Sequence, residues 1–221
     1  MKLLLSALIK FITGLLLVGA MLFLPAGTLK YANGWMFIGL LFIPILILGI
    51  VLFFKAPDLL KKRLDGKENE KTQKGVVALS GLCFFCGFVV AGLDFRFGWS
   101  NIPPWVVITG AVILLVSYVL YAEVMRENVY LSRKIEVQKD QKVVDTGLYG
   151  IVRHPMYAVT IWLFLSIPIV LGSWWSALCF LPYIPIIVVR ILNEEKLLME
   201  GLEGYLEYKK RVKYRIIPFI W

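Results

Sequence analysis

The sequence predicts an all-α integral membrane protein with about six transmembrane helices. Its composition is the first observation, because 59% of the 221 residues are hydrophobic and only 18% are charged. The mean hydropathy is +0.77. Soluble domains are typically about 45–50% apolar and about 25% charged, so the composition argues against a soluble globular enzyme. It also argues against disorder, which requires low hydrophobicity.

The second observation is a series of apolar runs, because a membrane-crossing helix needs about 20 mainly apolar residues. The runs are 3–24, 35–54, 75–93, 105–122, 155–171 and 174–192. The fifth run is at the short limit, so the last two could form a tilted hairpin. The first run has the basic start of a signal peptide, but it is too long and no small-residue cleavage site follows. We expect it to be retained as a span.

The third observation is the distribution of the 24 Lys and Arg residues, which exceed the 15 Asp and Glu residues and give a formal charge of +9. Seven lie in 55–74, six in 123–154 and six in 193–221, whereas 25–34 and 94–104 carry one each. Basic loops stay on the cytoplasmic side, so six spans with both termini in the cytoplasm place all three basic segments together. This reading accounts for the charge without nucleic acid, and we expect no nucleic-acid partner.

The three cysteines all lie within apolar runs. Cys83 and Cys86 form a CxxC pair, but no further ligands stand nearby, and Cys179 lies in the last run. Cysteine often behaves as a small apolar packing residue. We therefore expect neither a metal site nor a disulfide framework.

The only histidine, His154, stands between Arg153 and Pro155 at the start of the fifth run. Proline is favoured in the first turn of a helix, so His154 is expected at a helix start on the cytoplasmic face. Free backbone N–H groups and two basic side chains there could bind an anion. A polar cap at the membrane interface explains the same residues.

Arg190 and Glu194 lie near the end of the sixth run, four residues apart and so on one helix face. A charged residue near the hydrocarbon boundary is costly and often functional. The alternative is a snorkelling Arg190 that pairs with Glu194. The residues that follow, 198–212, form an apolar stripe typical of a helix lying on a membrane surface.

Taken together, these motifs resemble the isoprenylcysteine carboxyl methyltransferase family, which is related to the membrane phospholipid methyltransferases. The resemblance covers about 80 residues of the second half. Two positions depart from the eukaryotic pattern, because Gln141 stands where His is usual and Met156 where Ser is usual. The residues that carry the resemblance are Gln138, 141–144, Gly147, Tyr149, 153–157, Arg190, Glu194, Glu195 and Pro218.

The resemblance implies a cytosol-facing pocket for S-adenosyl-L-methionine, closed by the tail, and puts Arg190 at the lipidic acceptor. Glu195 is the candidate base if the acceptor is an amine that must lose a proton. We expect a four-helix transmembrane part over 1–122 and a catalytic part over 123–221. The expected cofactor contacts, with Arg153 added for its charge, are Gln138, Gln141, Lys142, Val143, Val144, Tyr149, Arg153, His154, Pro155, Met156, Tyr157 and Glu194.

The expected activity is carboxyl O-methylation of an isoprenylcysteine-like substrate by a membrane methyltransferase. The alternatives are a phospholipid N-methyltransferase, an NADPH-dependent sterol or isoprenoid reductase with a similar Arg-His-Pro-x-Tyr hairpin, and a membrane protein without enzymatic activity. The expected partner is a lipid or prenylated small molecule within the membrane. The compact length resembles that of prokaryotic members, which favours a prokaryotic plasma membrane.

Overall fold

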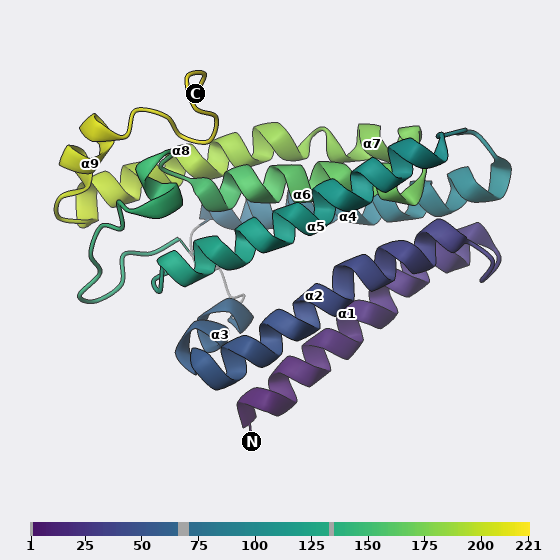
Figure 1. Cartoon of the computed structure of the whole chain (residues 1–221), viewed down its shortest axis with the longest axis horizontal. Coiled ribbons are helices and arrows are strands. Elements are labelled where there is room, and N and C mark those ends of the chain that lie inside the picture. The colour runs from purple at the N-terminus through teal and green to yellow at the C-terminus, as the bar shows by residue number, and fades with distance from the viewer. Residues whose placement is uncertain (1, 66–70, 133–134) are drawn as a thin grey trace.

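The chain folds into a bundle of long helices from which the first two diverge as a hairpin (Figure 1). The computed structural model describes residues 2–65, 71–132 and 135–221, and these ranges contain no β-strand. The elements in chain order are α1 (Lys2–Ala26), α2 (Ala32–Lys55), α3 (Pro57–Leu64), α4 (Lys71–Phe97), α5 (Pro104–Glu127), the 3-10 helix η1 (Gly147–Gly150), α6 (Pro155–Leu171), α7 (Trp174–Phe180), α8 (Tyr183–Gly201) and α9 (Tyr205–Arg211).

Five helical segments of the described chain are long and apolar enough to cross a membrane, which confirms the predicted all-α membrane class. They are Leu3–Ala26, Ala32–Lys55, Gln73–Phe97, Pro104–Glu127 and Trp174–Gly201. Helix α6 is apolar but has only 17 residues, the short fifth run of the sequence. The last segment is interrupted at Leu181 and Pro182, where α7 ends and α8 begins.

Helix α3 lies within the segment 55–74, which the apolar pattern leaves as a polar connector. Its local sequence explains it, because Pro57 occupies the first turn and Asp58 is acidic where the helix dipole favours a negative charge. Leu59 and Leu60 are buried. These two leucines pack α3 against the rest of the protein. The helix is too short and too highly charged to be recognised from the spacing of its apolar residues.

One end of the α1–α2 hairpin is joined tightly to the rest of the bundle. A Cβ atom at Gly92 of α4 would collide with the carbonyl oxygen of Leu22 in α1. The Tyr31 hydroxyl, in the turn after α1, donates a 2.5 Å hydrogen bond to the carbonyl of Leu171 at the end of α6. From this end the hairpin diverges from the other helices towards α3 (Figure 1).

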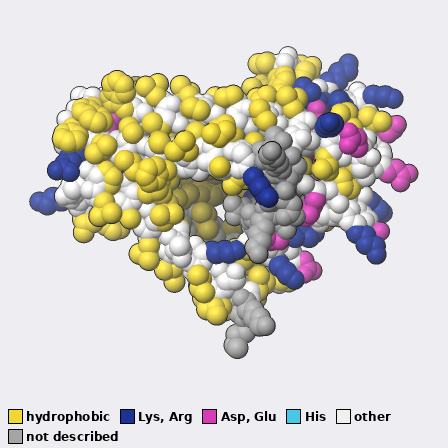
Figure 2. Space-filling view, turned by 180° about the vertical axis from the view of Figure 1, so that it is seen from behind, with side chains coloured by type: hydrophobic (Ala, Val, Ile, Leu, Met, Phe, Trp, Pro, Cys, Tyr) yellow, Lys and Arg dark blue, Asp and Glu magenta, His cyan; other side chains and the backbone are white. Residues whose placement is uncertain are grey.

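Charge and apolar surface are separated along the long axis. Figure 2 shows hydrophobic side chains over most of the length and charged side chains gathered at the end that holds α3 and α9. Exposed apolar side chains such as Leu16, Val119 and Trp162 belong to this apolar surface. This arrangement is that of a protein whose sides contact hydrocarbon and whose α3–α9 end, called the charged end below, meets water.

Candidate functional site

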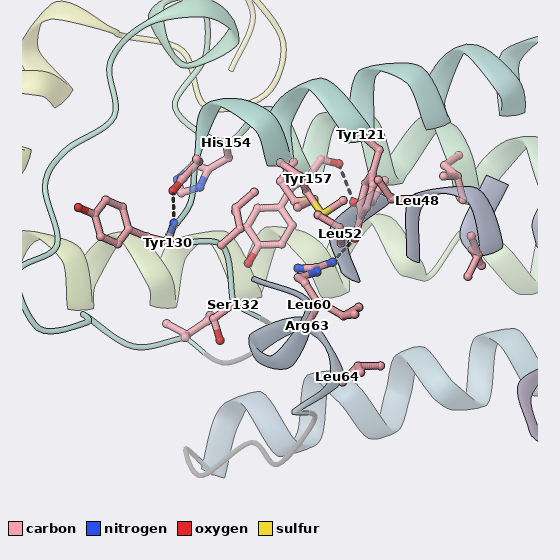
Figure 3. A pocket seen from close by; sticks show the side chains of 18 of the residues that line it. Leu48, Leu52, Leu60, Arg63, Leu64, Tyr121, Tyr130, Ser132, His154 and Tyr157 are labelled. Carbon is pink, nitrogen blue, oxygen red and sulfur yellow. Dashed lines mark hydrogen bonds between the residues drawn. The ribbon is translucent and has the colours of Figure 1, made fainter. Parts of the chain in front are cut away.

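A cavity of about 1090 Å³ lies between the α1–α2 hairpin and the remaining helices. Figure 2 shows a hollow with hydrophobic walls at this place, and Figure 3 shows it from close by. We call one part of its wall the apolar wing, formed by residues of α1, α2 and α4 that include Leu8, Phe11, Phe42, Leu46, Phe53 and Phe84. The polar end is formed by Tyr149, His154, Tyr157, Arg190, Glu194 and Tyr205.

The start of α6 is held by the C-terminal segment. His154 occupies the N-cap position and Pro155 begins the helix, as the sequence predicts. The backbone N–H of Arg153 donates to the carbonyl of Tyr214 at 2.9 Å, and that of His154 donates to the carbonyl of Arg215 at 2.8 Å. These two N–H groups therefore bind the chain itself, and the anion site expected at this helix start is not formed by them.

Glu195 is the centre of a buried cluster of charged side chains. It is 2% exposed, and one of its carboxylate oxygens accepts from Arg153 Nε at 2.7 Å and lies 3.4 Å from His154 Nε2. The other oxygen accepts from Arg215 Nε at 3.0 Å. A buried carboxylate is stable only when its charge is compensated in this way.

Arg153 extends the cluster to the chain that follows α9. Its Nη1 donates to the carbonyls of Val212 and Lys213, each at 2.7 Å. Arg153 thus holds the segment 212–215, which we call the docked tail, against α6. Both Glu195 oxygens are occupied and Glu195 is outside the cavity wall, so this geometry disfavours Glu195 as a general base.

Arg190 and Glu194 of α8 form a second group of charged side chains, and both line the cavity. The Tyr157 hydroxyl accepts from Arg190 Nε at 3.0 Å and donates to the carboxylate of Glu194. Arg190 also donates from Nη1 to Gln73 Oε1 at 2.9 Å, which links α8 to α4. Arg190 and Glu194 share one helix face, as their spacing predicts, and the Tyr157 hydroxyl bridges them.

The connector between α5 and α6 supplies another part of the wall. Gln141, Lys142, Val143 and Val144 line the cavity. Gln138 has a different position, because its amide accepts from Lys62 Nζ at 2.6 Å and donates to the carbonyl of Tyr130 at 2.5 Å. Its side chain thereby ties the connector to α3.

The 3-10 helix η1 depends on a glycine. Gly147 has a φ of +54°, in the region that only glycine adopts without cost. A Cβ atom there would collide with the carboxylate of Glu127, which accepts a 2.9 Å hydrogen bond from the backbone N–H of Leu148. The glycine therefore lets α5 cap the turn that presents Tyr149.

Tyr149 is fixed at both ends. Its hydroxyl accepts from Asn128 Nδ2 at 3.0 Å, and its carbonyl accepts from the Tyr208 hydroxyl at 2.8 Å. Burial raises the pKa of the Tyr149 hydroxyl, against the opposing effects of the Asn128 hydrogen bond and the positive charge of Arg63. The ring is thus a neutral aromatic surface in the cavity wall.

Tyr205 has a buried hydroxyl without a hydrogen-bond partner in the part of the chain that the structure describes. The residue is 3% exposed and lines the polar end. Burying a hydroxyl without a partner costs about 1–3 kcal/mol. A ligand with a polar group at this position would remove that cost.

A comparison with known protein families finds a match to part of the chain. Residues 106–200 match the sequence model of the isoprenylcysteine carboxyl methyltransferase (ICMT) family. This part of the chain, called the ICMT segment below, is similar to the ICMT family. No curated protein matches the chain at a significant level.

The ICMT segment contains all fourteen site residues that the sequence predicts. Eleven of the fourteen predicted residues line the cavity: Arg190, Gln141, Lys142, Val143, Val144, Tyr149, Arg153, His154, Met156, Tyr157 and Glu194. Gln138, Pro155 and Glu195 are outside its lining. The family resemblance is confirmed, while the individual roles of these residues stay predictions.

Many lining residues were not predicted as site residues from the sequence, among them Arg63, Tyr121 and Tyr205. Arg63 and Tyr121 lie outside the motifs, and Tyr205 was identified only as part of the apolar stripe of the tail. A basic residue directly after a membrane span was the available signal for Arg63, but such residues usually only flank the membrane. Among the described residues, no three His, Cys, Asp or Glu side chains are placed to hold a metal ion.

Proposed function

We propose that the protein transfers a methyl group from S-adenosyl-L-methionine to a lipidic acceptor, by carboxyl O-methylation of an isoprenylcysteine-like molecule. The coarser conclusion, a membrane methyltransferase, follows from the ICMT family match and the five apolar helices. One observation supports the finer proposal most. A single cavity of about 1090 Å³ joins polar and aromatic residues of the ICMT segment to the apolar wing.

The polar end has the groups that this methyl donor requires. Tyr149 and Tyr157 offer aromatic faces to the adenine or to the sulfonium, and such a cation–π contact contributes about 0.5–2 kcal/mol. Glu194 can accept hydrogen bonds from an amino group or a ribose. The Tyr205 hydroxyl, which has no partner among the described residues, offers one further hydrogen bond, so the residues present fit the donor.

Arg190 is suited to orient the acceptor. It lies one helical turn before Glu194, deeper in the apolar segment of α8. The donor is soluble and enters from water, whereas a lipidic acceptor enters from hydrocarbon. A planar guanidinium aligns a carboxylate by paired hydrogen bonds, so Arg190 is the residue that meets the acceptor.

The residues catalyse the reaction mainly by positioning. When bound, S-adenosylmethionine supplies an electrophilic methyl carbon; the acceptor oxygen forms the new bond as the carbon–sulfur bond breaks. Holding reactants in line can contribute about 7–11 kcal/mol. A carboxylate acceptor is already ionised at neutral pH and needs no base. Since Glu195 is fully engaged, this cavity favours a carboxylate over an amine acceptor.

We also propose an orientation and a division of labour. The three basic-rich segments support an orientation with the charged end and both termini in the cytoplasm, and we propose a prokaryotic plasma membrane as the location. Residues 123–221 supply the catalytic groups. Residues 1–122 supply most of the apolar wing, so the two parts build one site together.

The decisive experiment measures binding and product with purified protein. By calorimetry we expect S-adenosylmethionine to bind and NADPH not to bind. Glu194→Gln should weaken donor binding, whereas Glu200→Gln, at an exposed position of the same helix outside the cavity, should not. Binding of NADPH alone would refute the proposal.

The acceptor is identified in a second assay. Methyl transfer from labelled donor is compared for a farnesylated N-acetylcysteine and for phosphatidylethanolamine. We expect a base-labile methyl ester on the farnesylated cysteine. Base-stable methylation of the phospholipid amine alone would assign the protein to the N-methyltransferases instead.

A further inference from the structure

Arg63 is a charged residue of the cavity that lies outside the ICMT segment. It belongs to α3 and reaches into the cavity beside Leu60 and Leu52, towards Tyr121 of α5 (Figure 3). Its guanidinium donates to the Tyr121 hydroxyl and lies 5.5 Å from the centre of that ring. The wall around it is otherwise largely apolar.

Among the described residues, the Arg63 guanidinium uses only part of its hydrogen-bonding capacity. Arginine carries five N–H donors, and the hydrogen bond to Tyr121 engages one nitrogen. Within residues 2–65, 71–132 and 135–221, no carboxylate lies within ion-pair distance of Arg63. A partly buried charge without a counter-ion is costly, so the site is suited to a negatively charged ligand.

The charge of the whole cavity points the same way. Two glutamates line it against five Lys and Arg residues, counted over the described residues: Glu136 and Glu194 against Lys10, Arg63, Lys142, Arg153 and Arg190. A cleft lined mainly by one sign of charge concentrates ligands of the opposite sign. The adjacent apolar wing favours a hydrocarbon chain.

We propose that Arg63 and the Tyr121 hydroxyl bind the carboxylate or phosphate group of an amphiphile whose chain lies in the apolar wing. The inference rests on the proposed function only where it identifies this amphiphile as the methyl acceptor. Tyr121 accepts a hydrogen bond from Arg63, and its own hydroxyl proton is available to donate to the anion. Arg63 thereby captures the anionic headgroup as the amphiphile enters, before the carboxylate of an acceptor moves on to Arg190 for the reaction.

The test measures binding without turnover. Purified protein in non-ionic detergent is titrated with tritiated hexadecyl phosphate and hexadecanoate. Hexadecanol controls for the chain and inorganic phosphate for the headgroup. Arg63→Gln should weaken both anionic amphiphiles about tenfold or more, the effect of losing one charge-assisted hydrogen bond. Hexadecanol affinity should stay unchanged.

Matched variants separate the anion site from general effects of charge and folding. Lys61→Gln removes an equal charge from an exposed position of α3 outside the cavity, and it should bind like the wild type. Tyr121→Phe should weaken the anionic amphiphiles less than Arg63→Gln does. Unchanged S-adenosylmethionine binding in Arg63→Gln shows that the protein is folded. In turnover, this variant should raise the acceptor KM and leave kcat nearly unchanged.

The outcomes distinguish this inference from the proposed function. Equal affinity of the wild type and Arg63→Gln for the anionic amphiphiles overturns the anion site, whatever the enzyme methylates. Inorganic phosphate that competes as well as hexadecyl phosphate overturns the assignment to an amphiphile. A wild type that binds hexadecyl phosphate through Arg63 but does not bind S-adenosylmethionine refutes the proposed function alone.

Discussion

Replacing Glu195 by Gln tests whether the buried cluster holds the docked tail. The substitution keeps the shape of the side chain but removes the charge that compensates Arg153 and Arg215. Removing one partner of a buried ion pair costs about 3–5 kcal/mol. Because Arg215 is 25% exposed on its side chain and partly screened, we expect the lower end of this range.

A loss of about 3 kcal/mol raises the population of undocked tail roughly 100-fold. Hydrogen exchange followed by mass spectrometry measures the population of undocked tail, because the backbone N–H groups of Arg153 and His154 donate hydrogen bonds to carbonyls of the docked tail. Both amides should exchange faster in Glu195→Gln, together with residues 205–215. Glu200→Gln, on the same helix but exposed, is the matched control. Equal exchange in the Glu195 variant and the wild type would show that the tail is held by apolar contacts instead.

Three further expectations concern the site and its orientation. Arg190→Lys keeps the charge but loses the planar fork, so it should bind S-adenosylmethionine normally and lose most methyl transfer in single-turnover assays; a parallel loss of thermal stability would instead indicate a structural ion pair. Tyr205→Phe removes a buried hydroxyl without a described protein partner, so the melting temperature of the ligand-free protein should rise while donor affinity falls by about 0.5–1.5 kcal/mol; unchanged affinity by calorimetry would exclude this contact. In a cysteine-free background, Asn101→Cys should react with an impermeant maleimide added outside intact cells, and Lys61→Cys only after permeabilisation; the reverse pattern contradicts the proposed orientation.

The membrane helices could be predicted because a run of about 20 apolar residues identifies each one without knowledge of its tertiary contacts. The break at Leu181 and Pro182 was not predicted, since hydropathy does not register a helix interruption within an apolar run. The start of α6 at Pro155 was predicted, because proline restricts the backbone on both sides of it.

The site was predicted only where a motif carries it. Arg153 and Glu195 stand in the right motif, but the sequence cannot show that they bind each other and the docked tail. These contacts join residues 20 to 60 positions apart and depend on tertiary packing. Arg63 lies even further from the motifs, and only the approach of α3 to α5 brings it to the cavity.

The close packing of the α1–α2 hairpin at Gly92 and Tyr31 affects how a lipidic acceptor reaches the cavity. The α1–α2 hairpin is joined to the bundle at one end and diverges at the other, and the cavity is lined by the diverging parts, within 4–14 of α1 and 41–54 of α2. In the proposed orientation the charged end faces the cytoplasmic leaflet. An acceptor made in that leaflet diffuses sideways to the cavity with its headgroup already at the level of α3. One delivered to the outer leaflet must first cross the bilayer, so the proposed activity and orientation together predict methylation of the lipid pool of one leaflet only.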